Sequence, residues 1–71
     1  MQELDVRWLP QPEPFEKITR TLQMLPAAET LQVLIRREPF PLYDALRANG
    51  YAWQTTPLED GCFRILISRV S

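Results

Sequence analysis

The amino-acid sequence predicts an α+β fold, a two-layer α/β sandwich in which two helices cover one face of a mixed four-stranded sheet. Four short segments alternate apolar and polar residues, and two longer ones repeat apolar residues with the period of a helix. Their order is β-α-β-α-β-β. A strand–helix–strand unit forms a parallel pair through a right-handed crossover, whereas the closing hairpin must be antiparallel. The other sheet face is exposed or paired with a partner, which leaves the oligomeric state open.

The first strand is expected over residues 3–7, where apolar and charged residues alternate. Three prolines within residues 10–14 then exclude both a strand ladder and a helix interior. Pro14 suits the first turn of a helix, because its fixed φ fits and its missing N–H would have no helical partner there. Pro26 ends this helix. Its apolar stripe consists of Phe15, Ile18, Leu22 and Leu25.

A second strand is expected over residues 29–36, which are rich in alternating apolar and β-branched residues. Two prolines, Pro39 and Pro41, bracket the start of a second and shorter helix. The Asn49-Gly50 pair is a strong signal for its C-terminal end. Its apolar stripe consists of Leu42, Ala45 and Leu46.

The third strand is expected over residues 51–56, and the fourth over residues 63–68. The turn between them, residues 58–61, contains an Asp-Gly pair, which favours a hairpin. Tyr51 and Trp53 are assigned either to the core or to the uncovered face of the sheet. The predicted core consists of Ile18, Leu22, Val33, Ile35, Leu46, Phe63 and Ile65.

With 71 residues, the chain is expected to be a single domain over residues 1–71. No apolar run approaches the roughly 18 residues of a membrane span, so we expect a cytoplasmic protein that binds no membrane. The net charge of −1 argues against nucleic acid as a partner. One cysteine excludes an internal disulfide, and the absence of histidine removes the commonest metal ligand and general base. The sequence therefore predicts no catalytic residue, metal site or cofactor.

Both predicted helices begin where a strand has just ended, so their N-termini meet at one edge of the sheet. The two starts share one tripeptide, at Glu13-Pro14-Phe15 and Glu38-Pro39-Phe40, and arginine closely precedes each. Five of the seven prolines lie at this edge. Sites in α/β architectures are usually built at such an edge, and the free N–H groups of helix N-termini favour anions. We therefore expect this edge to bind a protein partner or a small anionic ligand.

Three kinds of residue at this edge are candidates for binding. Arginines at the strand ends supply positive charge, unless they only form ion pairs with neighbouring carboxylates. Aromatic residues either anchor an interface or cover the core as lids. The two glutamates are also explained by the preference for acidic residues in a first helical turn. The candidates are Arg7, Trp8, Gln11, Glu13, Arg36, Arg37, Glu38, Phe40 and Tyr43.

The residues Leu4-Asp5-Val6-Arg7, followed by Pro12-Glu13-Pro14, resemble the start of the TusA/SirA sulfur-carrier family, whose signature is Leu-Asp-x-x-Gly-x-x-Cys-Pro-x-Pro. Residues 36–43 and Asn49-Gly50-Tyr51 are closer to an uncharacterised bacterial relative, domain-of-unknown-function family 2249. The similarity runs over nearly the whole chain and implies the same β-α-β-α-β-β sandwich.

The resemblance does not bring the sulfur chemistry with it. In TusA-like carriers the cysteine just before Pro-x-Pro takes a persulfide, whereas the matching position here is Gln11, which has no ionisable nucleophile. Trp8 replaces the glycine of the signature. The favoured function is a non-enzymatic binding or adaptor module on a TusA-like scaffold. The alternative is a sulfur-transfer or redox-associated protein that uses Cys62, a thiol expected to be structural, with Arg64 as its only cationic neighbour.

Overall fold

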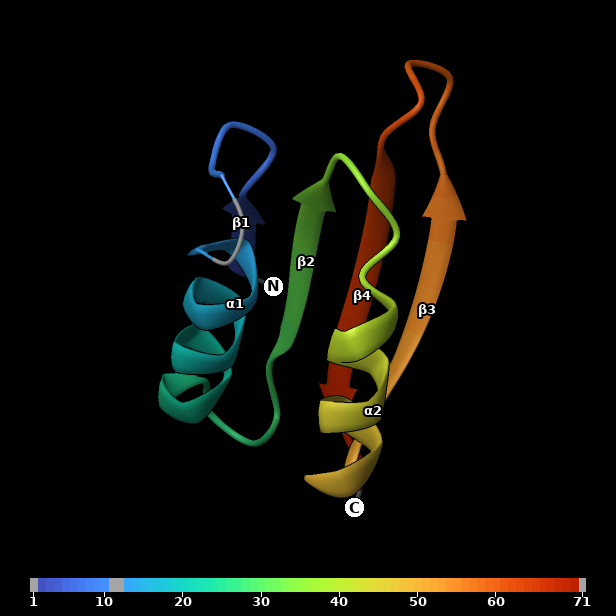
Figure 1. Ribbon diagram of the computed structural model, residues 1–71. Coiled ribbons are helices and arrows are strands. Elements are labelled where there is room, and N and C mark those ends of the chain that lie inside the picture. The colour runs from blue at the N-terminus through green and yellow to red at the C-terminus, as the bar shows by residue number, and fades with distance from the viewer. Residues whose placement is uncertain (1, 11–12, 71) are drawn as a thin grey trace.

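All six predicted elements are present in the predicted order (Figure 1). The computed structural model describes residues 2–10 and 13–70. Among these residues, no helix is long and apolar enough to span a membrane. The elements are β1 (Gln2–Asp5), α1 (Glu13–Met24), β2 (Thr30–Ile35), α2 (Phe40–Ala48), β3 (Tyr51–Pro57) and β4 (Phe63–Arg69).

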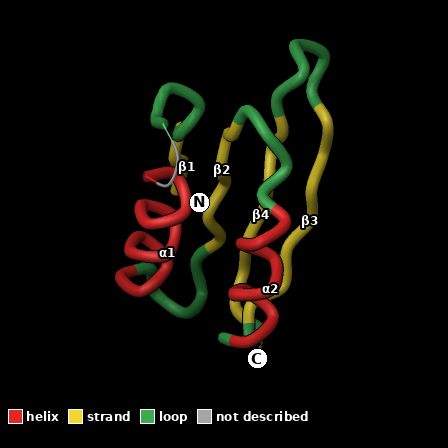
Figure 2. Tube along the Cα trace, viewed as in Figure 1, coloured by secondary structure: helices red, strands yellow, loops and turns green. Residues whose placement is uncertain are grey.

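The four strands form one mixed sheet in the order β1-β2-β4-β3. β1 is parallel to β2, and β4 is antiparallel to both of its neighbours, β2 and β3. Figures 1 and 2 show both helices on the same face of this sheet, with α1 over the β1 side and α2 over the β4 and β3 side. The predicted two-layer sandwich with a mixed sheet is therefore confirmed.

β1 ends earlier than predicted, at Asp5 rather than Arg7. Val6 keeps one bond to the neighbouring strand, from its N–H to the Leu34 carbonyl oxygen (2.9 Å). Asp5 then turns the chain, because its Oδ1 accepts a hydrogen bond from the backbone N–H of Arg7 (3.0 Å). Such a bond, from the backbone to an Asp side chain two residues earlier, is a common way to form a turn. Arg7 therefore belongs to the β1–α1 loop.

The core lies between the helices and the inner face of the sheet. Six of the seven residues predicted for it are buried, including Ile18 and Ile65, which are fully excluded from solvent. The seventh, Phe63, also packs against the core but is only partly buried, because it is the first residue of β4 and lies at the end of the sheet. The buried apolar residues are Val6, Ile18, Leu22, Leu25, Leu31, Val33, Ile35, Leu42, Leu46, Ile65 and Ile67.

β3 presents Tyr51 and Trp53 to the helices, which decides between the two predicted positions. Trp53 lies opposite Ile67 in the β3–β4 register, and Ile67 is fully buried in the core. Both aromatic side chains are partly buried and pack against the core. The uncovered face therefore carries the alternate residues of these strands, such as Gln54 and Leu66.

The turn between β3 and β4 forms as its Asp-Gly pair predicts. Gly61 has a φ of +86°, a backbone conformation that glycine adopts without a steric penalty. Its N–H donates a hydrogen bond to the Leu58 carbonyl oxygen (3.1 Å), and the Cys62 N–H donates to Asp60 Oδ1 (3.0 Å). The hairpin is thus closed by its own backbone and by one acidic side chain.

Candidate functional site

Three connections between elements meet at one edge of the sheet. Two of them were predicted to lie there from the sequence. The β1–α1 and β2–α2 loops leave the carboxyl ends of two parallel strands. Because Phe63 lies opposite Ile35 in the antiparallel β2–β4 pair, the β3–β4 turn reaches the same edge (Figure 1, upper side). The β3–β4 hairpin was predicted, but its position at this edge was not. That position depends on β4 pairing with β2, and the strand order was not predicted from the sequence.

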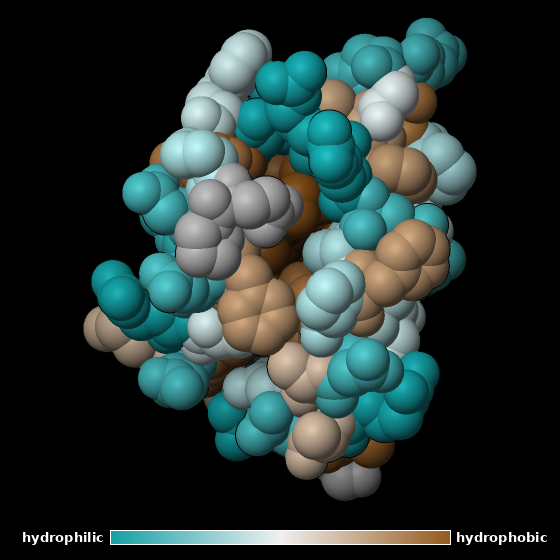
Figure 3. Space-filling model, viewed as in Figure 1, coloured by the Kyte–Doolittle hydropathy of each residue, from teal (hydrophilic) through white to brown (hydrophobic). Residues whose placement is uncertain are grey.

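Two adjoining hollows lie along this edge. One, of about 450 Å³, lies between the β1–α1 loop and the end of β2. The other, of about 510 Å³, lies between the starts of the two helices. Both are lined by Pro14, Ile35 and Arg37, so together they form one depression, which we call the edge groove. Figure 3 shows a hollow with a hydrophobic floor at this place, bordered by hydrophilic residues.

The floor of the edge groove is made of core residues. Val6, Ile18, Ile35 and Leu42 line it, and each exposes at most 4% of its surface. From the sequence, these residues were predicted to lie in strands and helix stripes, and their role in the groove was not predicted. For Val6, Ile35 and Leu42, a position near the end of a strand or the start of a helix at this edge was the one available signal.

Arg36 and Arg37 carry the unpaired positive charge of the groove. Both are exposed and line the first hollow, and Arg37 also lines the second. Neither makes an ion pair or hydrogen bond with any residue in the described part of the chain. For Arg36 and Arg37, the alternative prediction of ion pairs with neighbouring carboxylates is therefore wrong.

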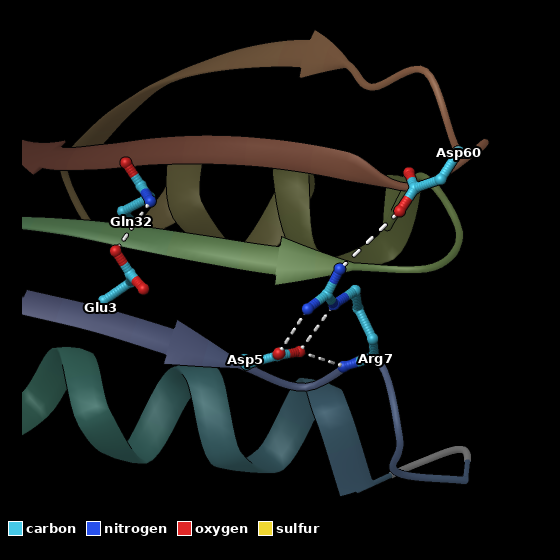
Figure 4. Close-up of polar contacts among 5 residues, drawn as sticks. All are labelled: Glu3, Asp5, Arg7, Gln32 and Asp60. Carbon is cyan, nitrogen blue, oxygen red and sulfur yellow. Dashed lines mark hydrogen bonds and ion pairs between the residues drawn. The ribbon is translucent and has the colours of Figure 1, made fainter.

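Arg7 differs from the other two arginines, because its guanidinium is already bound. Its Nε donates to Asp5 Oδ1 (3.0 Å) and its Nη2 to Asp5 Oδ2 (2.8 Å), and Nη1 lies 3.7 Å from Asp60 Oδ2 (Figure 4). These contacts raise the pKa of Arg7 above its ordinary value, the hydrogen bond to Asp5 contributing most. The same bond lowers the pKa of Asp5. Arg7 thus lines the groove with its charge largely compensated.

The N-termini of the two helices offer an anion fewer free N–H donors than the sequence suggested. In α2 the Phe40 N–H donates to the Glu38 carbonyl oxygen (3.1 Å) and the Leu42 N–H to that of Pro39 (2.9 Å), while Pro41 has no N–H. At the start of α1, the Glu13 N–H donates to the Pro10 carbonyl oxygen (3.0 Å), and Pro14 again has none. At these positions the backbone donors that the expected anion site required are therefore occupied or, at Pro14 and Pro41, absent.

The two most exposed aromatic residues at this edge are not lids over the core. Trp8 exposes 80% of its surface and Phe40 64%. Trp8 lines the edge groove, and its ring lies 6.0 Å from the Arg7 guanidinium carbon. Phe40 lies outside the groove lining and meets the Tyr43 ring edge-on, with centroids 5.9 Å apart. Trp8 is therefore the aromatic candidate that the structure brings to the groove.

Tyr43 belongs to the contact between α2 and β3. Its ring stacks on Trp53 with centroids 5.0 Å apart, and its hydroxyl lies 2.6 Å from Thr55 Oγ1. The same hydroxyl donates to Glu38 Oε2 (3.1 Å), so Glu38 lines the groove while holding Tyr43. Burial raises the pKa of Tyr43, which keeps the phenol protonated as this donor. Tyr43 is thus fixed away from the edge groove.

Of the two remaining candidates, the structure places only Glu13. Glu13 is exposed and lines a separate hollow along the outer side of α1, together with Glu16 and Lys17. Gln11, the residue at the position of the carrier cysteine, lies outside the described residues. Glu13 is therefore not a groove residue.

Cys62 lies in the turn at the same edge, half-buried. The expectation that Arg64 is the only cationic neighbour of Cys62 is wrong, because Arg7 also lies close enough to interact with Cys62 electrostatically. The thiol lines neither hollow of the edge groove. Within the described residues, no group of three or more Cys, Asp or Glu side chains is placed to hold a metal ion.

Comparisons with known proteins agree with this architecture. A family model described as "Uncharacterized conserved protein (DUF2249)" matches residues 3–69. The crystal structure of a SirA-like protein from Desulfitobacterium hafniense superposes with a TM-score of 0.86 at 19% identity, over 100% of both chains. At this identity the likeness shows the fold. No curated protein matches the sequence.

Proposed function

The chain belongs to the DUF2249 family of uncharacterized conserved proteins, and from this scaffold and the edge groove we propose that it is a non-enzymatic binding module. Its ligand is a segment of a partner protein that combines an apolar side chain with carboxylates. The single unpaired cysteine fits a reducing compartment, which supports a cytoplasmic location for this activity.

The observation that carries the proposal is a pair of arginines, without a partner among the described residues, above an apolar floor. A guanidinium binds a carboxylate through two parallel hydrogen bonds, so Arg36 and Arg37 favour an acidic ligand. The floor beneath them takes an apolar side chain, whose burial stabilises the complex. The exposed Trp8 at the rim is of the residue type that most often anchors interfaces.

The same geometry makes a small inorganic anion a poorer ligand than an acidic peptide. The N–H groups of Glu13, Phe40 and Leu42 are occupied, and Pro14 and Pro41 have none. An anion would therefore bind only to exposed guanidinium groups, and exposed ion pairs contribute about 1 kcal/mol or less. The apolar floor would gain nothing from it. A peptide that uses both features is the better match.

The test is an NMR titration of the full chain with three probes. These are a synthetic octapeptide with one leucine flanked by glutamates, the same peptide with lysine in place of glutamate, and sodium phosphate. The acidic peptide is expected to shift the amide signals of residues 6–9 and 35–38, and the lysine peptide is expected to shift none. Shifts confined to the uncovered sheet face, or equal responses to both peptides, would contradict the proposal.

Arg37→Ala tests the role of the groove arginines. A peptide seated on the apolar floor covers Arg37 and shields its carboxylate contact from water, unlike a free anion. We therefore expect the affinity for the acidic peptide to fall by at least tenfold, about 1.5–3 kcal/mol for a lost hydrogen bond to a charged group. The free energy of unfolding should change by less than about 0.5 kcal/mol, because Arg37 is exposed and unpaired. Arg64→Ala, which removes an exposed arginine from the uncovered face, is the matched control and should change neither quantity. Lost stability with unchanged binding would show that Arg37 only holds its own loop.

A further inference from the structure

Among the described residues, Glu38 is the one carboxylate that lines the edge groove. It borders the hollow between the helix starts and is half-buried. Its Oε2 accepts a hydrogen bond from the Tyr43 hydroxyl (3.1 Å), whereas no described donor binds its Oε1. Arg37 precedes it and lines the same hollow, but Glu38 forms no ion pair with Arg37 or any other described cation. The groove therefore holds uncompensated charge of both signs.

The structural contacts of Glu38 do not require its negative charge. The Tyr43 hydroxyl also lies 2.6 Å from Thr55 Oγ1, and a neutral glutamine would accept the same bond from Tyr43 through its amide oxygen. Glu38 also precedes Pro39, the N-cap of α2, so the preference for acidic residues in a first helical turn does not account for it. A half-buried charge costs free energy unless a partner compensates it. The Glu38 carboxylate is thus available to a ligand.

The charges of the edge groove are sorted along its length. Arg36 lines only the hollow beside the β1–α1 loop, and Glu38 lines only the hollow between the helix starts. Arg37 lines both hollows, where they adjoin. The Glu38 carboxylate lies on the α2 side, because it binds Tyr43, whose ring stacks on Trp53 of β3. Positive charge therefore lies toward β1 and negative charge toward α2, with the apolar floor beneath both.

We propose that Glu38 determines the specificity of the edge groove by selecting a partner segment with an acidic residue on one side of its apolar residue and a basic residue on the other. This inference rests on the proposed function and deepens it, because it names the second charge of the ligand. An extended segment presents every second side chain on one side. Its carboxylate binds Arg36 and Arg37, and its apolar side chain covers the floor beside Ile35. Its lysine or arginine binds Glu38.

Glu38 also acts against the wrong ligand. A segment with acidic residues on both sides of its apolar residue would bring a second carboxylate to the α2 end of the groove, where Glu38 repels it. Repulsion of this kind is a source of specificity in addition to attraction. The order of charges along the groove thus favours a segment of mixed charge over one that is only acidic.

Three octapeptides, each with one leucine, separate this inference from the proposed function. One has glutamates on both sides of the leucine, and two have glutamates on one side and lysines on the other, in the two possible orders. In NMR titrations of the full chain, the tighter of the two mixed peptides is expected to bind about threefold more tightly than the acidic peptide, the range of a partly exposed ion pair. Equal affinities would overturn this inference and leave the proposed function standing. No shift at the groove with any of the three would contradict both.

Glu38→Gln tests the residue itself. Because the amide oxygen keeps the acceptor for Tyr43, Tm should stay close to that of the parent chain. The variant is expected to bind the acidic peptide at least as tightly as the parent and to lose the preference for the mixed peptide. Glu59→Gln is the matched control, because Glu59 is exposed in the β3–β4 turn at the same edge and lines neither hollow. A preference that survives Glu38→Gln, or that Glu59→Gln removes equally, would show that the lysines respond to net charge, and the inference would fall.

Discussion

Ile35→Ala and Ile65→Ala remove the same atoms from the same face of the sheet, but only Ile35 borders the edge groove. Their exposed fractions are 4% and 0%. Losing three buried carbons costs about 2.4 kcal/mol of transfer free energy at ~0.8 kcal/mol each. Ile65 lies opposite Val33 in the middle of the β2–β4 pair, so its loss leaves a closed cavity that costs up to about 2 kcal/mol more. At Ile35 the emptied space joins the open groove, and this second cost largely disappears.

We therefore expect Ile65→Ala to lower the free energy of unfolding by about 4 kcal/mol and Ile35→Ala by about 2.5 kcal/mol. Urea unfolding followed by fluorescence of the two tryptophans measures both. Leu34→Ala, next to Ile35 but on the uncovered face, is the control and should cost the least. Equal losses at Ile35 and Ile65 would mean that the groove floor is closed. A loss below about 0.5 kcal/mol at both would refute the strand register itself.

Two further predictions concern the turn residues at the same edge. Arg7 lowers the pKa of Asp5 below its ordinary value of 3.8, so the carboxylate stabilises the fold above that pH and less as pH falls through the lower folded value. Asp5→Asn should therefore lower Tm near pH 7 but not near pH 2, whereas Asp44→Asn, on an exposed ion pair, should leave both unchanged. Cys62→Ser should fold and bind the acidic peptide like the parent chain. Intact mass after incubation with a cysteine desulfurase and cysteine should stay constant, and a stable gain of about 32 Da would favour sulfur transfer instead.

The fold could be predicted because its signals are local. The prolines of the β1–α1 loop and the Asn49-Gly50 pair mark helix boundaries through φ and missing donors, and apolar spacing then marks the buried faces. Phe63 shows where this reasoning ends. Its alternation with Ile65 correctly places it on the inner face, but alternation does not say how far the helices extend along the sheet.

The edge that carries the candidate site could also be predicted, but the directions of its side chains could not. The guanidinium of Arg7 is hydrogen-bonded to Asp5, two residues earlier. The alternation of apolar and polar residues does not predict this contact. Tyr43 is fixed by Thr55, twelve residues away and on another element. Arg36 and Arg37 stay unpaired because neither loop nor turn brings a described carboxylate within bonding distance. Such outcomes depend on three-dimensional neighbours.

The prolines determine which kind of ligand the edge can hold. In the TusA/SirA carrier family, which this sequence resembles, a helix N-terminus activates a thiol through its donors and dipole. Here Pro14 and Pro41 lack two such donors and Gln11 stands in place of the thiol, so the recognition proposed above depends on side chains. Guanidinium groups exposed to solvent bind carboxylates weakly and are screened by salt. Useful affinity therefore requires that the ligand also bury apolar surface on the floor beside Ile35, which a protein segment can do and a free anion cannot.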